Sequence, residues 1–69
     1  MEDKLENWFS YHTPTEEQKL QYQEIRDAAK AFAKVVVANT PASADQSAAI
    51  RLLRECVMTA NASIACNGQ

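Results

Sequence analysis

Asn39-Thr40-Pro41-Ala42-Ser43 decides the fold, because this stretch reverses the chain between two long helical segments. Pro41 disfavours helical geometry at Thr40 and so ends the first of them. Ser43, with Gln46 three residues later, predicts a capping box that starts the second. A connection this short makes the two helices antiparallel neighbours. The sequence therefore predicts a helical hairpin.

The two segments that flank the turn carry the apolar spacing of helices packed lengthwise. The segment 13–39 has no glycine and no internal proline, and its apolar seam is predicted to be Tyr22, Ile25, Ala29, Phe32 and Val36. The segment from about 44 to 65 has the corresponding seam Ile50, Leu53, Val57, Ala60 and Ile64. Further apolar residues widen both seams: Ala28, Ala33, Val35, Ala49, Leu52 and Cys56. One partner helix cannot cover arcs this wide, so we expect the remainder to meet another subunit.

Chain length and cysteine spacing also favour self-association. A chain of 69 residues buries only a modest fraction of its surface and needs extra stabilisation. Cys56 and Cys66 lie about 15 Å apart on a helix, too far for a disulfide within the chain. One histidine and two distant cysteines do not form a zinc set, and we expect no cofactor. The remaining source of stabilisation is self-association, so we expect a homo-oligomer.

Charge and hydropathy limit the location and the partners. The acidic N-terminus without a long apolar run predicts neither a signal peptide nor a membrane span. Free thiols indicate a reducing cytoplasm. The net charge of −2 argues against binding to DNA or RNA polymers, although a small anion needs only two or three cations. No arrangement of nucleophile and base, paired carboxylates or glycine-rich loop indicates an enzyme.

The N-terminal part is predicted to be a short arm, residues 1–12, before a hairpin domain, residues 13–69. Asp3 is expected to cap a short amphipathic helix. Thr13 is expected to cap the first long helix, with Pro14 at its first position and Glu16 completing a capping box. This corner would fix the direction of the aromatic residues that precede it.

A basic stripe is the first candidate for binding. Arg26, Lys30 and Lys34 follow one another at four-residue spacing, with neighbours about 6 Å apart. None has an acidic residue four positions before it. Arg26 lies at the rim of the apolar arc, where its guanidinium would suit a phosphate. The alternative interpretation is an ordinary solvated face.

Four further residues are candidates for ligand contact, each with a structural alternative. Phe9 and Tyr11 would stack on a nucleobase, or else hold the arm down as local core. His12 would donate a hydrogen bond to a phosphate or base, or else be a structural residue whose ring is hydrogen-bonded within the corner. Asn61 would read a base edge, or else bind a neighbouring backbone group.

Four pieces of the chain, in the same order and spacing, resemble a known family: Phe9-Ser10-Tyr11-His12-Thr13-Pro14-Thr15, Glu24-Ile25-Arg26-Asp27-Ala28-Ala29-Lys30, Pro41-Ala42-Ser43 and Ala60-Asn61-Ala62-Ser63-Ile64-Ala65. The family is the hairpin domain shared by phage anti-CBASS and anti-Thoeris nucleotide sponges. The length of the chain resembles the anti-CBASS branch more closely.

The resemblance implies an anti-defence sponge that acts in the cytoplasm of the infected bacterium. Such proteins bind cyclic dinucleotides, cyclic trinucleotides or cyclic ADP-ribose isomers without cleaving them, and so keep the immune effector silent. The resemblance also implies a compact homo-oligomer, a hexamer in the best-known branch, with pockets between subunits. A tyrosine that stacks on the base and a cation that meets the phosphates correspond to Tyr11 and Arg26.

The chain departs from this family pattern at three positions. The family tends to have tryptophan and arginine where this chain has Thr59 and Cys66. That arginine would serve a second pocket for cyclic trinucleotides, so the resemblance leaves this activity open here. Ala28 lacks the hydroxyl that some members place near the phosphate-binding cation. The alternative function is a small helical adaptor whose free apolar arc docks a partner protein.

Overall fold

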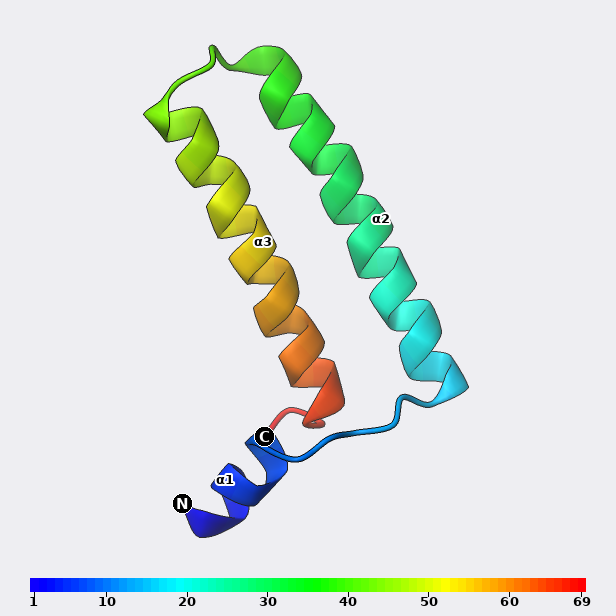
Figure 1. Cartoon of the computed structure of the whole chain (residues 1–69). Helices are drawn as coiled ribbons and strands as arrows, with labels where there is room; N and C mark the ends of the chain where they lie inside the picture. The colour runs from blue at the N-terminus through cyan, green and yellow to red at the C-terminus, as the bar shows by residue number, and fades with distance from the viewer.

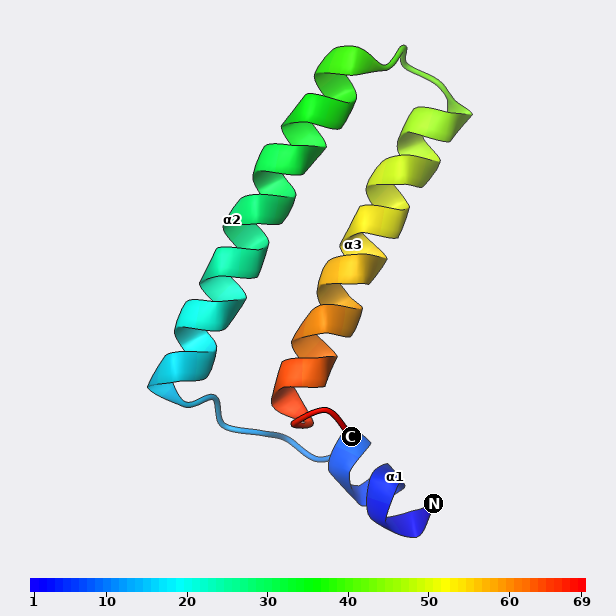
Figure 2. The same ribbon diagram turned by 180° about the vertical axis from the view of Figure 1, so that it is seen from behind.

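The computed structural model describes residues 1–69 and contains three helices and no strands: α1 (Glu2–Trp8), α2 (Glu16–Asn39) and α3 (Ala44–Ala65). The two long helices, α2 and α3, run antiparallel beside each other, and α1 lies beyond the C-terminal end of α3 (Figures 1 and 2). The predicted all-α class is confirmed, and the two long helices form the predicted hairpin.

The turn between α2 and α3 ends one helix and starts the next largely as predicted. Thr40 is extended, with φ −125° and ψ 147°, and Ser43 Oγ accepts the backbone N–H of Gln46 at 3.1 Å. The Gln46 side chain does not complete the capping box. Its amide instead donates to the carbonyl and the hydroxyl oxygen of Thr40, both at 3.1 Å. Gln46 thus ties the two sides of the turn together.

The start of α2 differs from the prediction, because Thr15 and not Thr13 is the N-cap. The side chain of Thr15 accepts the N–H of Gln18 at 3.1 Å, and Gln18 Oε1 accepts the N–H of Thr15 at 3.0 Å. Gln18 Nε2 also donates to the carbonyl of Ile64 at the end of α3, at 3.3 Å. An amide can accept and donate at once, whereas the carboxylate of Glu16 only accepts. The later capping box therefore also joins the two helices.

The predicted cap of the first helix is wrong, whereas the predicted end of the last helix is confirmed. Asp3 does not cap α1: the N-cap is Met1, without a side-chain bond, and Asp3 lies in the first turn, where its charge suits the helix dipole. At the other end α3 stops as predicted. Asn67 and Gly68 have φ of 54° and 77°, in the left-handed region, and Gly68 N–H donates to the Ser63 carbonyl at 2.8 Å. This is the hydrogen bond of a Schellman motif.

No residue of this chain is fully buried. The molecule measures 44 × 27 × 15 Å, so it is about one helix thick, and nothing covers the sides of the hairpin. Its accessible surface is 5615 Å², whereas a monomeric protein of 7.7 kDa exposes about 4,300 Å². A single copy therefore leaves exposed much of the surface that a folded protein of this mass buries.

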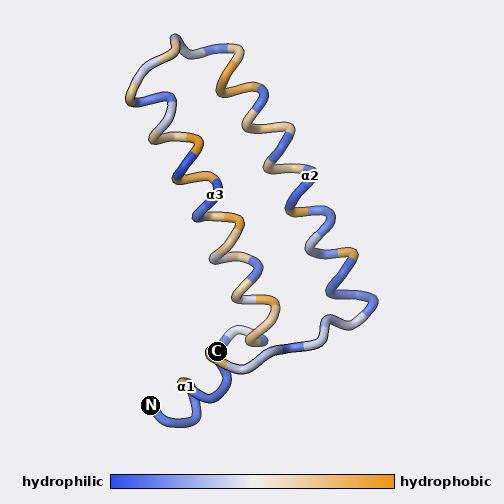
Figure 3. Tube along the Cα trace, viewed as in Figure 1, coloured by the Kyte–Doolittle hydropathy of each residue, from blue (hydrophilic) through white to orange (hydrophobic).

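The predicted seams form the half-buried contact between α2 and α3, with one exception. All predicted seam residues of α3 are half-buried, as are Tyr22, Ile25, Ala29 and Val36 of α2. Apolar positions recur along both helices (Figure 3). Phe32 was wrongly assigned to this contact: it is 58% exposed, and Ala33 takes the half-buried place beside it.

Replacing Gln18 by Ala is expected to lower the free energy of unfolding by about 1–3 kcal/mol, because the substitution removes the N-cap pair and the bond to Ile64. Urea unfolding at one fixed protein concentration measures this change. Gln21→Ala, at an exposed position of the same helix, is the control. Equal losses in the two variants would contradict the role of Gln18.

Candidate functional site

A groove of about 350 Å³ runs along one face of the hairpin between α2 and α3. Its lining residues come from both helices: Arg26, Ala29, Lys30, Ala33, Ile50, Leu53, Arg54, Val57 and Met58. Six of these nine are hydrophobic, so the groove has an apolar floor with cations beside it. The volume lies at the lower end of the range typical of small-molecule sites, about 300–1,000 Å³. We call this surface the basic groove.

The cations of the basic groove have no carboxylate partner. The only ion pair in the chain joins Lys19 Nζ to Glu16 Oε1 at 3.0 Å, near the start of α2. Arg26 instead donates to Gln23 Oε1 at 2.5 Å, and Gln23 Nε2 donates to Asp27 at 2.7 Å. Gln23 therefore holds one side of the guanidinium and leaves its charge unneutralised by direct contact. An anion such as phosphate suits this arrangement.

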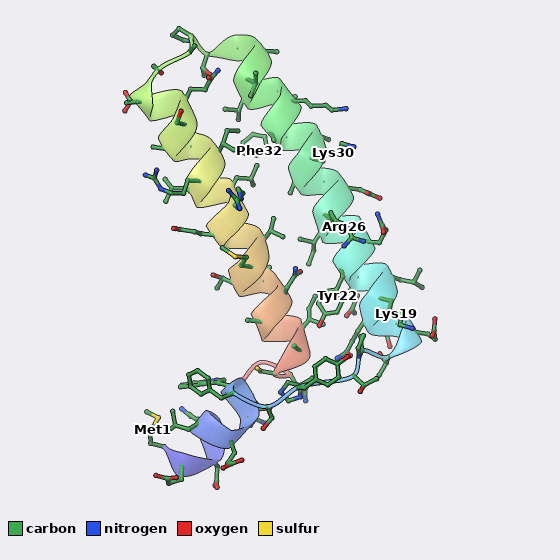
Figure 4. All side chains as sticks on the ribbon, in the orientation of Figure 1. Met1, Lys19, Tyr22, Arg26, Lys30 and Phe32 are labelled. Carbon is green, nitrogen blue, oxygen red and sulfur yellow. The ribbon has the colours of Figure 1, made fainter.

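Helical spacing brings Arg26 and Lys30 together, as predicted from the stripe. Both residues line the basic groove, and Figure 4 shows them at successive levels of α2. Lys34, the third member of the stripe, lies further toward the turn and lines a separate apolar hollow with Lys30 and Val37. The stripe is thus divided between two surfaces.

Arg54 is the residue that sequence reasoning missed as a member of this site. It comes from α3 and completes the set of three cations around the groove. The signal was present in the sequence, because Lys30 and Arg54 each lie 12 residues from Ala42, at the centre of the turn. In an antiparallel hairpin, residues equally distant from the turn lie opposite each other.

The opposite face of the hairpin is apolar and uncovered. On a helical wheel of about 100° per residue, its members lie on the sides of the two seams that face away from the cations. They are Ala28, Phe32, Val35, Ala49, Leu52 and Cys56. The side chains of Phe32, Val35 and Leu52 are 58%, 55% and 61% exposed. We call this surface the apolar face.

The two aromatic candidates lie outside the basic groove. Phe9 and Tyr11 are 84% and 87% exposed, and neither lines the groove. They follow α1 at the open end of the hairpin. Arg26 lies about 15 Å along α2 from its first residue, Glu16. The alternative that these aromatics form a local core is wrong for this chain, and the structure does not bring them to Arg26.

The remaining two candidates differ in how their polar atoms are engaged. His12 Nε2 lies 2.6 Å from the carbonyl oxygen of Asn7, so one ring nitrogen binds the backbone of the arm. Asn61 is half-buried on α3, and its Oδ1 is buried without a hydrogen-bond partner. A buried acceptor without a partner is unfavourable, so Asn61 is left able to accept one further hydrogen bond.

Arg54→Gln is expected to weaken binding of pyrophosphate at low salt about tenfold, because a charge-assisted hydrogen bond to an anion contributes about 1.5–3 kcal/mol. Isothermal calorimetry measures the dissociation constant. Arg51→Gln is the matched control, since Arg51 is exposed on the same helix but does not line the groove. Equal weakening in both variants would indicate general charge attraction and contradict a site at the groove.

Comparison with known protein families matches residues 1–65 to the family described as Acb2/Tad1, hairpin domain. No curated protein and no solved structure matches the chain. Within the chain no group of three or more His, Cys, Asp or Glu residues is placed to hold a metal ion. None of the three helices combines the length and the apolarity that crossing a membrane requires.

Proposed function

The chain belongs to the Acb2/Tad1 hairpin-domain family, and from that premise we propose that it is a phage sponge for cyclic nucleotides. It binds a cyclic immune signal of the infected bacterium and withholds it from the effector. The ligand is released chemically unchanged. The finer proposal is that the ligand is a cyclic dinucleotide, a cyclic trinucleotide or a cyclic ADP-ribose isomer, and that the blocked pathway is CBASS or Thoeris.

The basic groove is the observation that carries this proposal. Arg26, Lys30 and Arg54 line it without forming an ion pair, above a floor of apolar side chains. A cyclic nucleotide combines phosphates, which need cations, with bases and sugars that pack on apolar surface. The same arrangement would allow a chain with a net charge of −2 to bind a small anion.

We further propose that each site is completed by a second copy of the chain. Tyr11 does not line the groove that contains Arg26, and its ring is almost fully exposed. The apolar face and the excess of accessible surface both favour burial against other copies. A compact homo-oligomer, with hexamers as the expected form, would bring the arm of one subunit to the groove of another.

In this arrangement the six predicted residues have separate tasks. Tyr11 and Phe9 stack on the bases, while Arg26 and Lys30 bind the phosphates, now joined by Arg54. Asn61 offers its unpaired acceptor to a base amino group. The nitrogen of His12 that does not bind Asn7 would reach the ligand. The place of action would be the cytoplasm of the infected cell.

A protein-binding adaptor remains the rival function, because the apolar face would also suit a partner protein. It leaves the three unpaired cations of the basic groove without a role. A pull-down that yields one stoichiometric protein partner, with no nucleotide in the purified sample, would favour the adaptor.

Calorimetry with cyclic GMP–AMP, cyclic di-GMP, cyclic di-AMP, a cyclic trinucleotide and cyclic ADP-ribose isomers tests the proposal. The folded oligomer is expected to bind at least one of them, and Arg26→Ala and Tyr11→Ala are each expected to weaken binding about tenfold or more, through loss of a phosphate bond or of base stacking.

Two controls accompany this measurement. Light scattering establishes that each variant keeps the mass of the unmodified protein, and chromatography of ligand recovered after denaturation establishes whether it is intact. Silence across the whole panel would overturn the proposed function. Return of a cleaved ligand would identify an enzyme instead of a sponge.

A further inference from the structure

The short helix α1 is attached to the end of α3 by hydrogen bonds and not by an apolar core. Asn7 Nδ2 donates to the carbonyl of Cys66 at 3.1 Å, and Trp8 Nε1 donates to the carbonyl of Gln69 at 2.9 Å. The thiol of Cys66 lies 3.9 Å from the carbonyl oxygen of Asn7. We call this set of residues, Asn7, Trp8, His12, Cys66 and Gln69, the terminal latch.

Asn7 is the central residue of the terminal latch, because its two ends serve different partners. Its side chain donates to the end of α3, while its backbone oxygen accepts from His12 Nε2 at 2.6 Å. The bond to His12 closes the short loop of residues 9–12 back onto α1. The bonds made by Asn7 are partly buried, so water competes with them less than at the open surface.

This loop contains both aromatic candidates, and neither is held by packing of its own ring. Phe9 and Tyr11 are 84% and 87% exposed, so where their rings can reach depends on the position of the loop backbone. Tyr11 directly precedes His12, whose ring is bound to Asn7. The two hydrogen bonds that meet at Asn7 therefore help to fix the loop that carries Tyr11 against the end of α3.

We propose that Asn7 is a positioning residue for ligand binding, which fixes the aromatic loop against the end of α3 without touching the ligand. This inference rests on the proposed function, because it concerns how Tyr11 is presented to a cyclic nucleotide. Seven residues are too few for an isolated helix to be stable in water, so an opened latch frees the whole arm. Ligand affinity then falls in proportion to the fraction of chains with a closed latch.

Asn7→Asp is the sharpest substitution, since it keeps the shape of the side chain while it replaces the amide donor with a charged acceptor. The new carboxylate also faces the carbonyl of Cys66, at the negative end of α3. Asn39→Asp is the matched control. Asn39 Nδ2 donates to the carbonyl of Val35 at the end of α2, at 2.8 Å, so the chemical change is the same but lies at the opposite end of the hairpin.

Trp8 provides a readout of the latch that does not depend on ligand, because it is the only tryptophan in the chain. Its side chain is held by Gln69 and the residue is 43% exposed. Opening the latch in Asn7→Asp is expected to raise the acrylamide quenching constant of Trp8 fluorescence about twofold, as local opening removes the remaining protection. Asn39→Asp is expected to leave the quenching constant unchanged.

Ligand affinity is then measured by calorimetry, with the cyclic dinucleotide among cyclic GMP–AMP, cyclic di-GMP and cyclic di-AMP that the unmodified protein binds most tightly. Asn7→Asp is expected to bind it about tenfold more weakly at unchanged oligomeric mass, and Asn39→Asp with unchanged affinity. Asn7→Ala, which removes the donor without adding charge, replaces Asn7→Asp should that variant not fold.

Two results would overturn the inference while the proposed function stands. One is a raised quenching constant of Trp8 with unchanged ligand affinity, and the other is an unchanged quenching constant in the folded Asn7 variant. An unmodified protein that binds no cyclic dinucleotide in the panel would overturn the role of Asn7 in binding together with that ligand class. In that case the Trp8 measurement still reports the latch itself, so the two failures are distinguishable.

Discussion

The fold depends on one constraint: a two-helix layer about 15 Å thick has no interior, and no residue of this chain is buried. The seams between α2 and α3 cover only one side of each helix. The remaining surface divides into a basic groove on one face and an apolar face on the other. Self-association through the apolar face would supply the missing core and leave the groove to receive a ligand. Self-association would then be required both for the stability of the chain and for ligand binding.

The sequence predicted the hairpin because its decisive signals are local. Pro41 and Ser43 act on their immediate neighbours, and α3 has the predicted bounds, Ala44–Ala65. The N-cap of α2 was wrongly predicted because two neighbouring residues both suit that position. Thr13 and Thr15 each stand three residues before an acidic or amide side chain, and Thr15 prevails because Gln18 also reaches Ile64 on α3. That bond spans 46 residues, and local capping rules do not include it. Phe32 was misplaced for a similar reason, since spacing alone does not reveal how closely two helices approach.

Only part of the candidate site could be predicted from the sequence, and the reason is again physical. Arg26 and Lys30 share a helix, so their proximity follows from spacing, whereas Arg54 required the register of the hairpin. The exposure of Phe9 and Tyr11 depends on how the arm is attached. That attachment uses backbone carbonyls of Cys66 and Gln69, and any residue type presents a carbonyl. The pairing of Tyr11 with Arg26 across subunits lies beyond what one chain displays and stays a prediction.

Mixed oligomers of Tyr11→Ala and Arg26→Ala subunits test most directly whether the site is built between subunits. The two variants are assembled together in equal amounts and isolated through two different affinity tags, and the number of ligand sites is measured by calorimetry. If Tyr11 of one subunit serves the groove of another, random assembly restores the unmodified affinity at about a quarter of the sites, although each variant alone binds about tenfold or more weakly. Mixed oligomers of the correct mass with no restored sites would contradict the account, because both residues would then have to act within one subunit.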